Sequence, residues 1–141
     1  FDDLVKLTNL SENHSINKIV DVSLAKNTKE TLRVLNENIF SAEDIIIIIR
    51  SYLIKSKRLL RLTTELEKNK NIDQVISASK PPIFWKDKDI VKKQLKIWTK
   101  ENTIILIQKI NEIELQLKKN TESSLNILQN FIMELSLEPN T

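Results

Sequence analysis

The chain contains no glycine among its 141 residues. At the average usage of about 7%, a chain of this length would carry roughly ten. Glycine-rich phosphate loops, dinucleotide fingerprints and nucleophile elbows all need backbone that approaches a ligand closely or adopts positive φ. The sequence therefore excludes nucleotide binding through those motifs, and its helices must end without a glycine cap.

Lysine–asparagine pairs stand at the joints where glycine caps would otherwise be expected. The pairs are Lys26-Asn27, Lys68-Asn69 and Lys119-Asn120. Asparagine tolerates the left-handed conformation that ends many helices, and lysine suits the negative end of the helix dipole. Joints this short connect helices that pack roughly antiparallel. The sequence predicts an all-α bundle of about five to six helices with short loops.

Apolar spacing and cap residues place the first three helices. Ser15 is predicted to cap a helix carrying Ile16, Ile19, Val20 and Leu24, and Thr28 a second carrying Leu32, Leu35 and Ile39. Ser41 and Asp44 resemble a capping box that opens a long third helix toward Lys68. Its isoleucine run over residues 45–49 would also suit a strand. The apolar spacing continues through Ile46, Ile49, Leu53, Leu60 and Leu62 without a turn signal, which favours a helix.

The second half of the chain shows clearer boundaries. Asn71 and Gln74 open a short helix that Pro81 and Pro82 are expected to end, because proline and its predecessor both leave helical space. Thr99 and Thr121 are the predicted caps of the last two helices, and Pro139 marks the end of the second. Their apolar stripes are Leu106, Ile110, Ile113 and Leu117, then Leu125, Leu128, Ile132 and Leu135. These two helices should pack together.

Composition removes most kinds of active site. The chain has no cysteine and one histidine, His14, so disulfides, thiolate metal sites and histidine metal clusters are excluded. No pair of carboxylates recurs at a catalytic spacing, so we expect neither enzymatic activity nor a cofactor. No long uncharged apolar run occurs, which predicts a soluble, cytoplasmic protein without membrane contact. A net charge of +3 tolerates nucleic acid or an acidic partner without requiring either.

The motif PPIFWKDK at residues 81–88 combines a stiff extended segment with large apolar side chains. Phe84 is predicted to plug this loop onto the bundle. Trp85 is either a core residue or, beside Lys86 and Lys88, a stacking surface for single-stranded nucleic acid. Lys92 continues the basic run. These lysines, and a second run of Arg50, Lys55, Lys57, Arg58 and Arg61, form either solvated faces or phosphate contacts.

Trp98 follows Ile90, Val91 and Leu95 at core spacing, so it is predicted to be buried. Glu114 lies among apolar residues and should face solvent or pair across helices. His14, in a polar stretch over residues 9–14, is expected to be exposed. That stretch is the predicted domain boundary, with residues 1–14 as the end of a preceding domain and residues 15–141 as a helical domain. The chain is expected to be a fragment of a longer protein.

Several motifs follow one another in an informative order. A basic, leucine-rich segment (RLLRL, residues 58–62) precedes Pro81, Pro82 and the aromatic pair; then come Gln94-Leu95, Trp98-Thr99 and Glu114-Leu115-Gln116-Leu117-Lys118. In this order the chain, over about residues 15–137, resembles the C-terminal domain of the delta subunit of bacterial DNA polymerase III, a clamp-loader subunit. It departs from the family pattern at Asp87, within a usually basic cluster, and at Lys119-Asn120, where glycine is common.

The resemblance implies a helical collar domain that assembles without catalysing a reaction. Its partners would be the collar domains of the gamma or tau and delta-prime subunits, joined in a pentameric ring. The sliding clamp would be reached only through a domain outside this chain, and primed DNA would be a further contact through Trp85, Lys86, Lys88 and Lys92. Any DNA-directed DNA polymerase or nucleotidyltransferase activity would belong to the holoenzyme during DNA replication.

Two other classes of function remain open from the residues alone. An independent helical adaptor would show an apolar patch that closes against a second copy. A basic helical nucleic-acid-binding module would show salt-dependent affinity when tested by itself.

Overall fold

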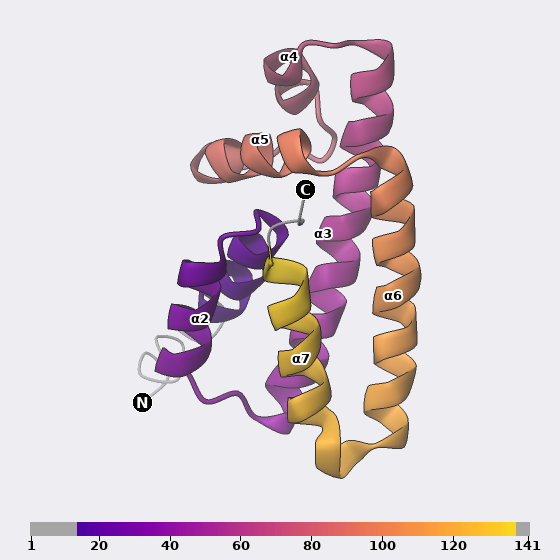
Figure 1. The fold of residues 1–141 in the computed structure, drawn as a ribbon. Coiled ribbons are helices and arrows are strands. Elements are labelled where there is room, and N and C mark those ends of the chain that lie inside the picture. The colour runs from indigo at the N-terminus through magenta and orange to yellow at the C-terminus, as the bar shows by residue number, and fades with distance from the viewer. Residues whose placement is uncertain (1–13, 138–141) are drawn as a thin grey trace.

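The computed structural model describes residues 14–137, and every regular element in that range is a helix (Figure 1). A first helix covers residues 14–24. The others are α2 (Thr28–Glu37), α3 (Ala42–Lys68), α4 (Ile72–Ser77), α5 (Lys88–Ile97), α6 (Lys100–Lys119) and α7 (Ser124–Ser136), with 3-10 turns η1 (Trp85–Asp87) and η2 (Thr121–Ser123). The predicted all-α bundle is confirmed, with seven α-helices in the described range instead of five or six.

The long helix α3 organises the bundle. Among α2–α7, it packs side by side with α6 more extensively than any other pair, and α7 packs against both. The first helix and α2 lie on the α7 side, while α4 and α5 cover the C-terminal part of α3 (Figure 1). No helix in residues 14–137 is both long and apolar enough to cross a membrane.

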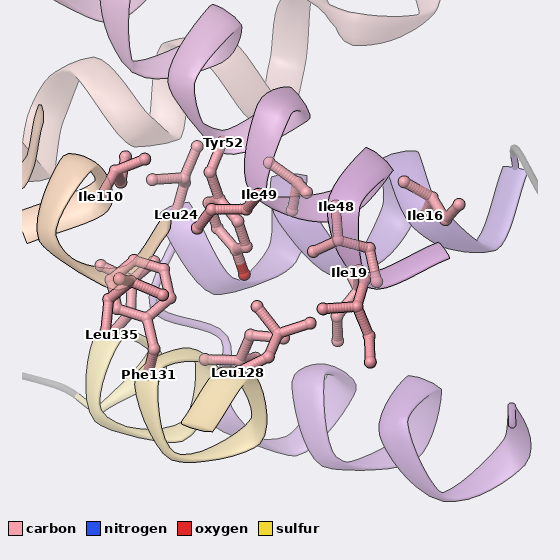
Figure 2. Packing of buried hydrophobic residues seen from close by; sticks show 14 of the residues in the cluster. Ile16, Ile19, Leu24, Ile48, Ile49, Tyr52, Ile110, Leu128, Phe131 and Leu135 are labelled. Carbon is pink, nitrogen blue, oxygen red and sulfur yellow. The ribbon is translucent and has the colours of Figure 1, made fainter. Parts of the chain in front are cut away.

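The main core forms where the first helix, α3, α6 and α7 meet (Figure 2). Tyr52 of α3 is fully buried at its centre. Its ring meets that of Phe131 edge to face, with centroids 5.3 Å apart and planes at 81°, a favoured aromatic geometry. Leu24, Ile49 and Leu128 surround this pair. Neither aromatic residue was predicted from the sequence as a core residue.

A second, smaller core holds α4 and α5 against the end of α3. It contains Leu59, Leu62, Val75, Ile76, Ile83, Val91 and Leu95. Trp98 packs against both cores, so it joins them. Its indole Nε1 donates a hydrogen bond to the backbone oxygen of Leu24 at 2.7 Å. Trp98 was predicted to be buried, but it is only partly buried where it packs between the two cores.

The helix ends do not use asparagine as predicted. Lys26 takes the left-handed conformation with φ 56°. Asn69 and Asn120 have φ of −124° and −127°, so neither adopts it. Asn27, and not Thr28, caps α2 by accepting a hydrogen bond from the Glu30 backbone. The Thr28 hydroxyl instead donates to the backbone oxygen of Ser136 at 2.7 Å and ties α2 to the end of α7.

Some of the other predicted helix caps are confirmed, and others are wrong. Ser41 and Asp44 form the capping box of α3, Asn71 accepts from the Gln74 backbone, and Thr99 caps α6. Ser15 is not a cap, because the first helix already includes His14. Thr121 opens η2, and α7 begins only at Ser124. The helix α4 ends at Ser77, before the prolines that were expected to stop it.

The predicted apolar faces of α2 and α3 are correct only in part. Ile49 and Leu62 are buried and Leu35 packs against the main core, but other predicted residues face solvent. Ile46 is 50% exposed, while Ile45, Ile48 and Tyr52 point inward. Five consecutive isoleucines fit several helical phases, so the sequence pattern alone does not select one. Ile39 lies outside α2 and is 99% exposed, and Leu32 is also exposed.

The stripes of the last two helices fare better. All four predicted residues of α6 are buried, as are Leu128, Ile132 and Leu135 of α7, while Leu125 is exposed. The predicted packing between α6 and α7 is confirmed. The predicted boundary stretch, residues 9–14, lies outside the described residues except for His14, which belongs to the first helix. The predicted stop at Pro139 also lies outside the described residues.

Candidate functional site

The joint between α4 and α5 carries the aromatic motif. Ile83 is buried in the second core, whereas Phe84 is 58% and Trp85 is 70% exposed. The prediction that Phe84 plugs the loop onto the bundle is therefore wrong, and Ile83 takes that place. Phe84 has extended backbone (φ −60°, ψ 138°), and successive side chains of an extended segment point to opposite sides. Burying Ile83 leaves Phe84 in solvent.

The two exposed rings lie close together. Their centroids are 6.1 Å apart with planes at 35°, and the Lys86 Nζ lies 5.6 Å from the centroid of the Trp85 ring. A cation within about 6 Å of a ring is attracted to its face. Because Trp85 is exposed, the alternative that it is a core residue is wrong. The ring is an exposed aromatic surface beside a cation, which is the chemistry that stacks on bases.

The lysines predicted to accompany Trp85 differ in their surroundings. Lys86 and Lys88 are exposed at the turn η1 and the start of α5. Lys92 is partly buried, and its Nζ donates to a carboxylate oxygen of Asp73 at 3.2 Å, which ties α5 to α4. Asp87 and Asp89 lie within the same stretch. The cationic part of this surface therefore centres on Lys86 and Lys88.

A groove of about 760 Å³ lies beside the aromatic pair, between the first helix, α3 and η1. Phe84 and Lys86 line it on one side, and His14 lines it as an exposed residue of the first helix. Within it the Lys55 Nζ donates to the Asp21 carboxylate at 2.7 Å. Burial raises the pKa of the Asp21 carboxyl, although Lys55 acts in the opposite direction. This ion pair engages Lys55, one of the cations predicted as a solvated or phosphate-binding residue.

Most of the motif residues in and next to α5 are in contact with the rest of the bundle. Gln94 is buried and its Nε2 donates to the backbone oxygen of Asp21 at 3.0 Å, while Leu95 belongs to the second core. The Lys26 Nζ lies 4.8 Å from the Trp98 ring centroid, and burial lowers the Lys26 pKa. Pro81 and Pro82 are exposed. Together, Gln94, Leu95 and Trp98 fix α5 against the first helix and α3.

The remaining motif residues lie elsewhere. Leu117 is buried in the main core, and Glu114 pairs with Lys118 at 3.4 Å along α6. These residues line a groove of about 320 Å³ between the start of α3 and the end of α6. Lys100, the first residue of α6, lies close to Trp98 in the sequence. At a rise of 1.5 Å per residue, Leu117 is about 25 Å further along α6 from Lys100. The structure therefore separates the motif into two places at opposite ends of α6.

One feature of the surface was missed from the sequence. Ile54 of α3 is 68% exposed, and Ile47 and Ile46 are about half exposed, among the exposed cations Arg50, Lys57 and Arg61. Of these three isoleucines, only Ile46 was predicted from the sequence to lie on the apolar face of α3. Ile54 itself falls outside the predicted core spacing, which was the available signal that it faces solvent.

Within residues 14–137 no group of three or more His, Asp or Glu side chains is placed to hold a metal ion. Comparisons of the chain with protein-family models, with curated proteins and with solved structures find no match.

Proposed function

We propose that this chain is the non-catalytic collar domain of a clamp-loader delta subunit of bacterial DNA polymerase III. The observation that supports it most is the placement of the motif around Gln94, Leu95 and Trp98. Trp98 packs against both cores of the all-α bundle, Leu95 lies in the second core, and Gln94 donates a hydrogen bond to the first helix. The three motif residues therefore hold α5 to the rest of the bundle. The resemblance accounts for why these residue types occur together.

In this proposal the chain acts by assembling with other proteins. Its partners are the collar domains of the gamma or tau and delta-prime subunits, and a domain outside this chain contacts the sliding clamp. The exposed isoleucines of α3 support an assembly role, because apolar side chains gathered on a surface mark interaction sites more often than scattered ones do. The chain contributes no hydrolysis and takes no cofactor.

The test is a binding titration with the collar domains of the gamma or tau and delta-prime subunits from the same source. We expect a saturable complex with a dissociation constant below about 10 μM, equivalent to a binding free energy of about −7 kcal/mol. A collar domain from an unrelated assembly is the control. No binding of folded components at that concentration, by the chain or by the longer protein that contains it, would contradict the proposal.

A second contact, with single-stranded DNA, is favoured by the exposed Trp85 ring and its neighbour Lys86. Base stacking on an aromatic side chain contributes about 1–3 kcal/mol. Trp85→Ala is therefore expected to weaken binding of a single-stranded oligonucleotide by the clamp-loader assembly by about 5- to 150-fold. Fluorescence anisotropy measures the affinity.

The matched control is Leu115→Ala, which removes an exposed apolar side chain near the far end of α6. It should leave DNA affinity unchanged. Because Trp85 is exposed, Trp85→Ala should change the free energy of unfolding by less than about 0.5 kcal/mol. Unchanged DNA affinity in Trp85→Ala, or equal losses in both variants, would rule out this DNA contact.

A further inference from the structure

One face of α3 combines cations with exposed isoleucines at regular helical spacing. Its members are Ile47, Arg50, Ile54, Lys57 and Arg61, spaced three, four, three and four residues apart, and all are exposed. We call this face the basic stripe. Between Asp44 and Glu65 the helix α3 carries no acidic residue, so nothing on α3 itself neutralises the stripe along that length.

The groove between α3 and α6 adjoins the N-terminal end of the basic stripe. Its apolar lining includes Ile46, Ile49 and Leu117, and its charged lining is Arg50, Lys118 and Glu114. Because Glu114 pairs with Lys118 at 3.4 Å, Arg50 is the cation left to meet a ligand there. Arg50 belongs to both features, so the groove and the stripe form one continuous surface.

We propose that this surface docks an acidic amphipathic helix of a partner protein. From Ile46 to Arg61 the surface is about 22 Å long, which matches about four turns of helix. The apolar side chains of the partner would cover Ile47 and Ile54 and place one anchor in the groove, as in other helix-in-groove complexes. Its carboxylates would meet Arg50, Lys57 and Arg61, and arginine is enriched at such interfaces.

Two other occupants fit this surface less well. Two copies of the chain packed through their basic stripes would set arginine and lysine against one another, and like charges at an interface oppose association. Single-stranded nucleic acid binds through stacking on aromatic rings, and the basic stripe has none. Its isoleucines instead require an apolar partner. An acidic amphipathic helix satisfies both the charge and the apolar surface.

The test uses this chain and a synthetic helical peptide of about 15 residues, four turns long. The peptide carries leucines at positions i, i+4, i+7 and i+11 and glutamates beside them, and a second peptide has lysine in place of every glutamate. Backbone amide NMR shifts locate the binding. We expect the acidic peptide to saturate and to shift amides of α3 and the end of α6, while the lysine peptide does not bind.

Ile54→Glu and Arg50→Glu are each expected to weaken the acidic peptide at least about tenfold, by placing a carboxylate against the peptide's own acidic groups. Lys29→Glu is the matched control. It makes the same change of charge as Arg50→Glu on an exposed residue of α2, where the first turn tolerates a carboxylate. All three positions are exposed, so circular dichroism should show each variant folded like the parent chain.

Three results would overturn the inference. The first is no saturable shift up to about 1 mM of acidic peptide, which corresponds to a binding free energy weaker than about −4 kcal/mol. The second is a set of shifts located away from the basic stripe. The third is an equal loss of peptide affinity in Arg50→Glu and Lys29→Glu. An oligonucleotide that displaces the peptide from α3 would assign the surface to nucleic acid instead. Because the test needs no clamp-loader subunit, its failure is separate from any failure of the proposed function.

Discussion

At the scale of single residues, a buried hydroxyl pair shows how the main core accommodates polar groups. The Ser23 hydroxyl donates to the backbone oxygen of Val20 at 3.0 Å, and the Tyr52 hydroxyl lies 2.6 Å from the Ser23 oxygen. Since Ser23 has one proton and gives it to Val20, Tyr52 donates to Ser23. Burial raises the pKa of Tyr52, so the tyrosine remains a neutral donor.

Removing only the Tyr52 hydroxyl measures the contribution of its hydrogen bond with Ser23 to stability. Tyr52→Phe keeps the ring against Phe131 and should lower the free energy of unfolding by about 1 kcal/mol, the usual net value of one hydrogen bond. Tyr52→Ala should cost about 3–5 kcal/mol, because it also leaves a cavity in the core. Urea unfolding measures both. A Phe variant as unstable as the Ala variant would show that the hydrogen bond, and not the packing, dominates.

The ion pair between Asp21 and Lys55 predicts an unusual pH dependence. Burial raises the Asp21 pKa above its ordinary 3.8. Between pH 3.8 and the raised pKa, the Asp21 carboxyl is therefore protonated to a greater extent in the folded chain than in the unfolded chain. The free energy of unfolding that depends on Asp21 therefore falls as the pH rises from about 3.8 through the raised pKa. Below 3.8 the contribution is fully present.

Asp21→Asn isolates this contribution, because asparagine does not titrate. We expect the stability of the parent chain relative to Asp21→Asn to decrease as the pH rises from about 3.8. Urea unfolding at several pH values, at constant ionic strength, provides the comparison. The opposite trend, a relative gain with rising pH, is the behaviour of an ion pair that lowers the carboxyl pKa, and it would show that Lys55 outweighs burial.

At the scale of helices, the chain predicts elements better than it predicts which of their faces are buried. The capping box of Ser41 and the single apolar stripe of α6 are local patterns, and both were predicted correctly. The phase of α3 depends on which isoleucines of residues 45–49 meet other helices. Those contacts join residues far apart in the sequence, so the local pattern leaves them open. The exposed Phe84 and buried Ile83 show the same dependence on tertiary packing.

The two cores predict that the helices do not share one local stability. Leu95 is buried in the small core with α4, and Leu128 is buried in the main core. Leu95→Ala and Leu128→Ala should each cost about 2–5 kcal/mol. Hydrogen exchange should show that Leu95→Ala loosens α4 and α5 while α6 and α7 stay protected, because locally packed units open separately.

Leu128→Ala is the comparison for this prediction. Since the main core contains the first helix, α3, α6 and α7, this variant should lower the protection of those helices together. If Leu95→Ala reduced the protection of every helix equally, the two cores would unfold as one cooperative unit. The bridging contacts of Trp98 would then be strong enough to couple them completely.

At the scale of the whole molecule, the two proposed contact surfaces lie on different parts of the helical bundle. The aromatic pair lies at η1 and the residue before it, whereas the basic stripe lies on α3. The proposed DNA contact and the proposed protein contact would therefore occupy separate places. The sequence motifs pointed toward the first of these. The second depends on which side of α3 faces solvent, and it could be recognised only once the bundle was assembled.

The central claim is that this chain joins a clamp-loader collar, and the most direct measurement is the mass of the assembly. Native mass spectrometry of the chain mixed with gamma or tau and delta-prime collar domains should give a closed complex of five collar domains that includes this chain. A ring that forms without this chain, or a chain that remains monomeric or pairs only with itself in the presence of folded partners, would contradict the claim.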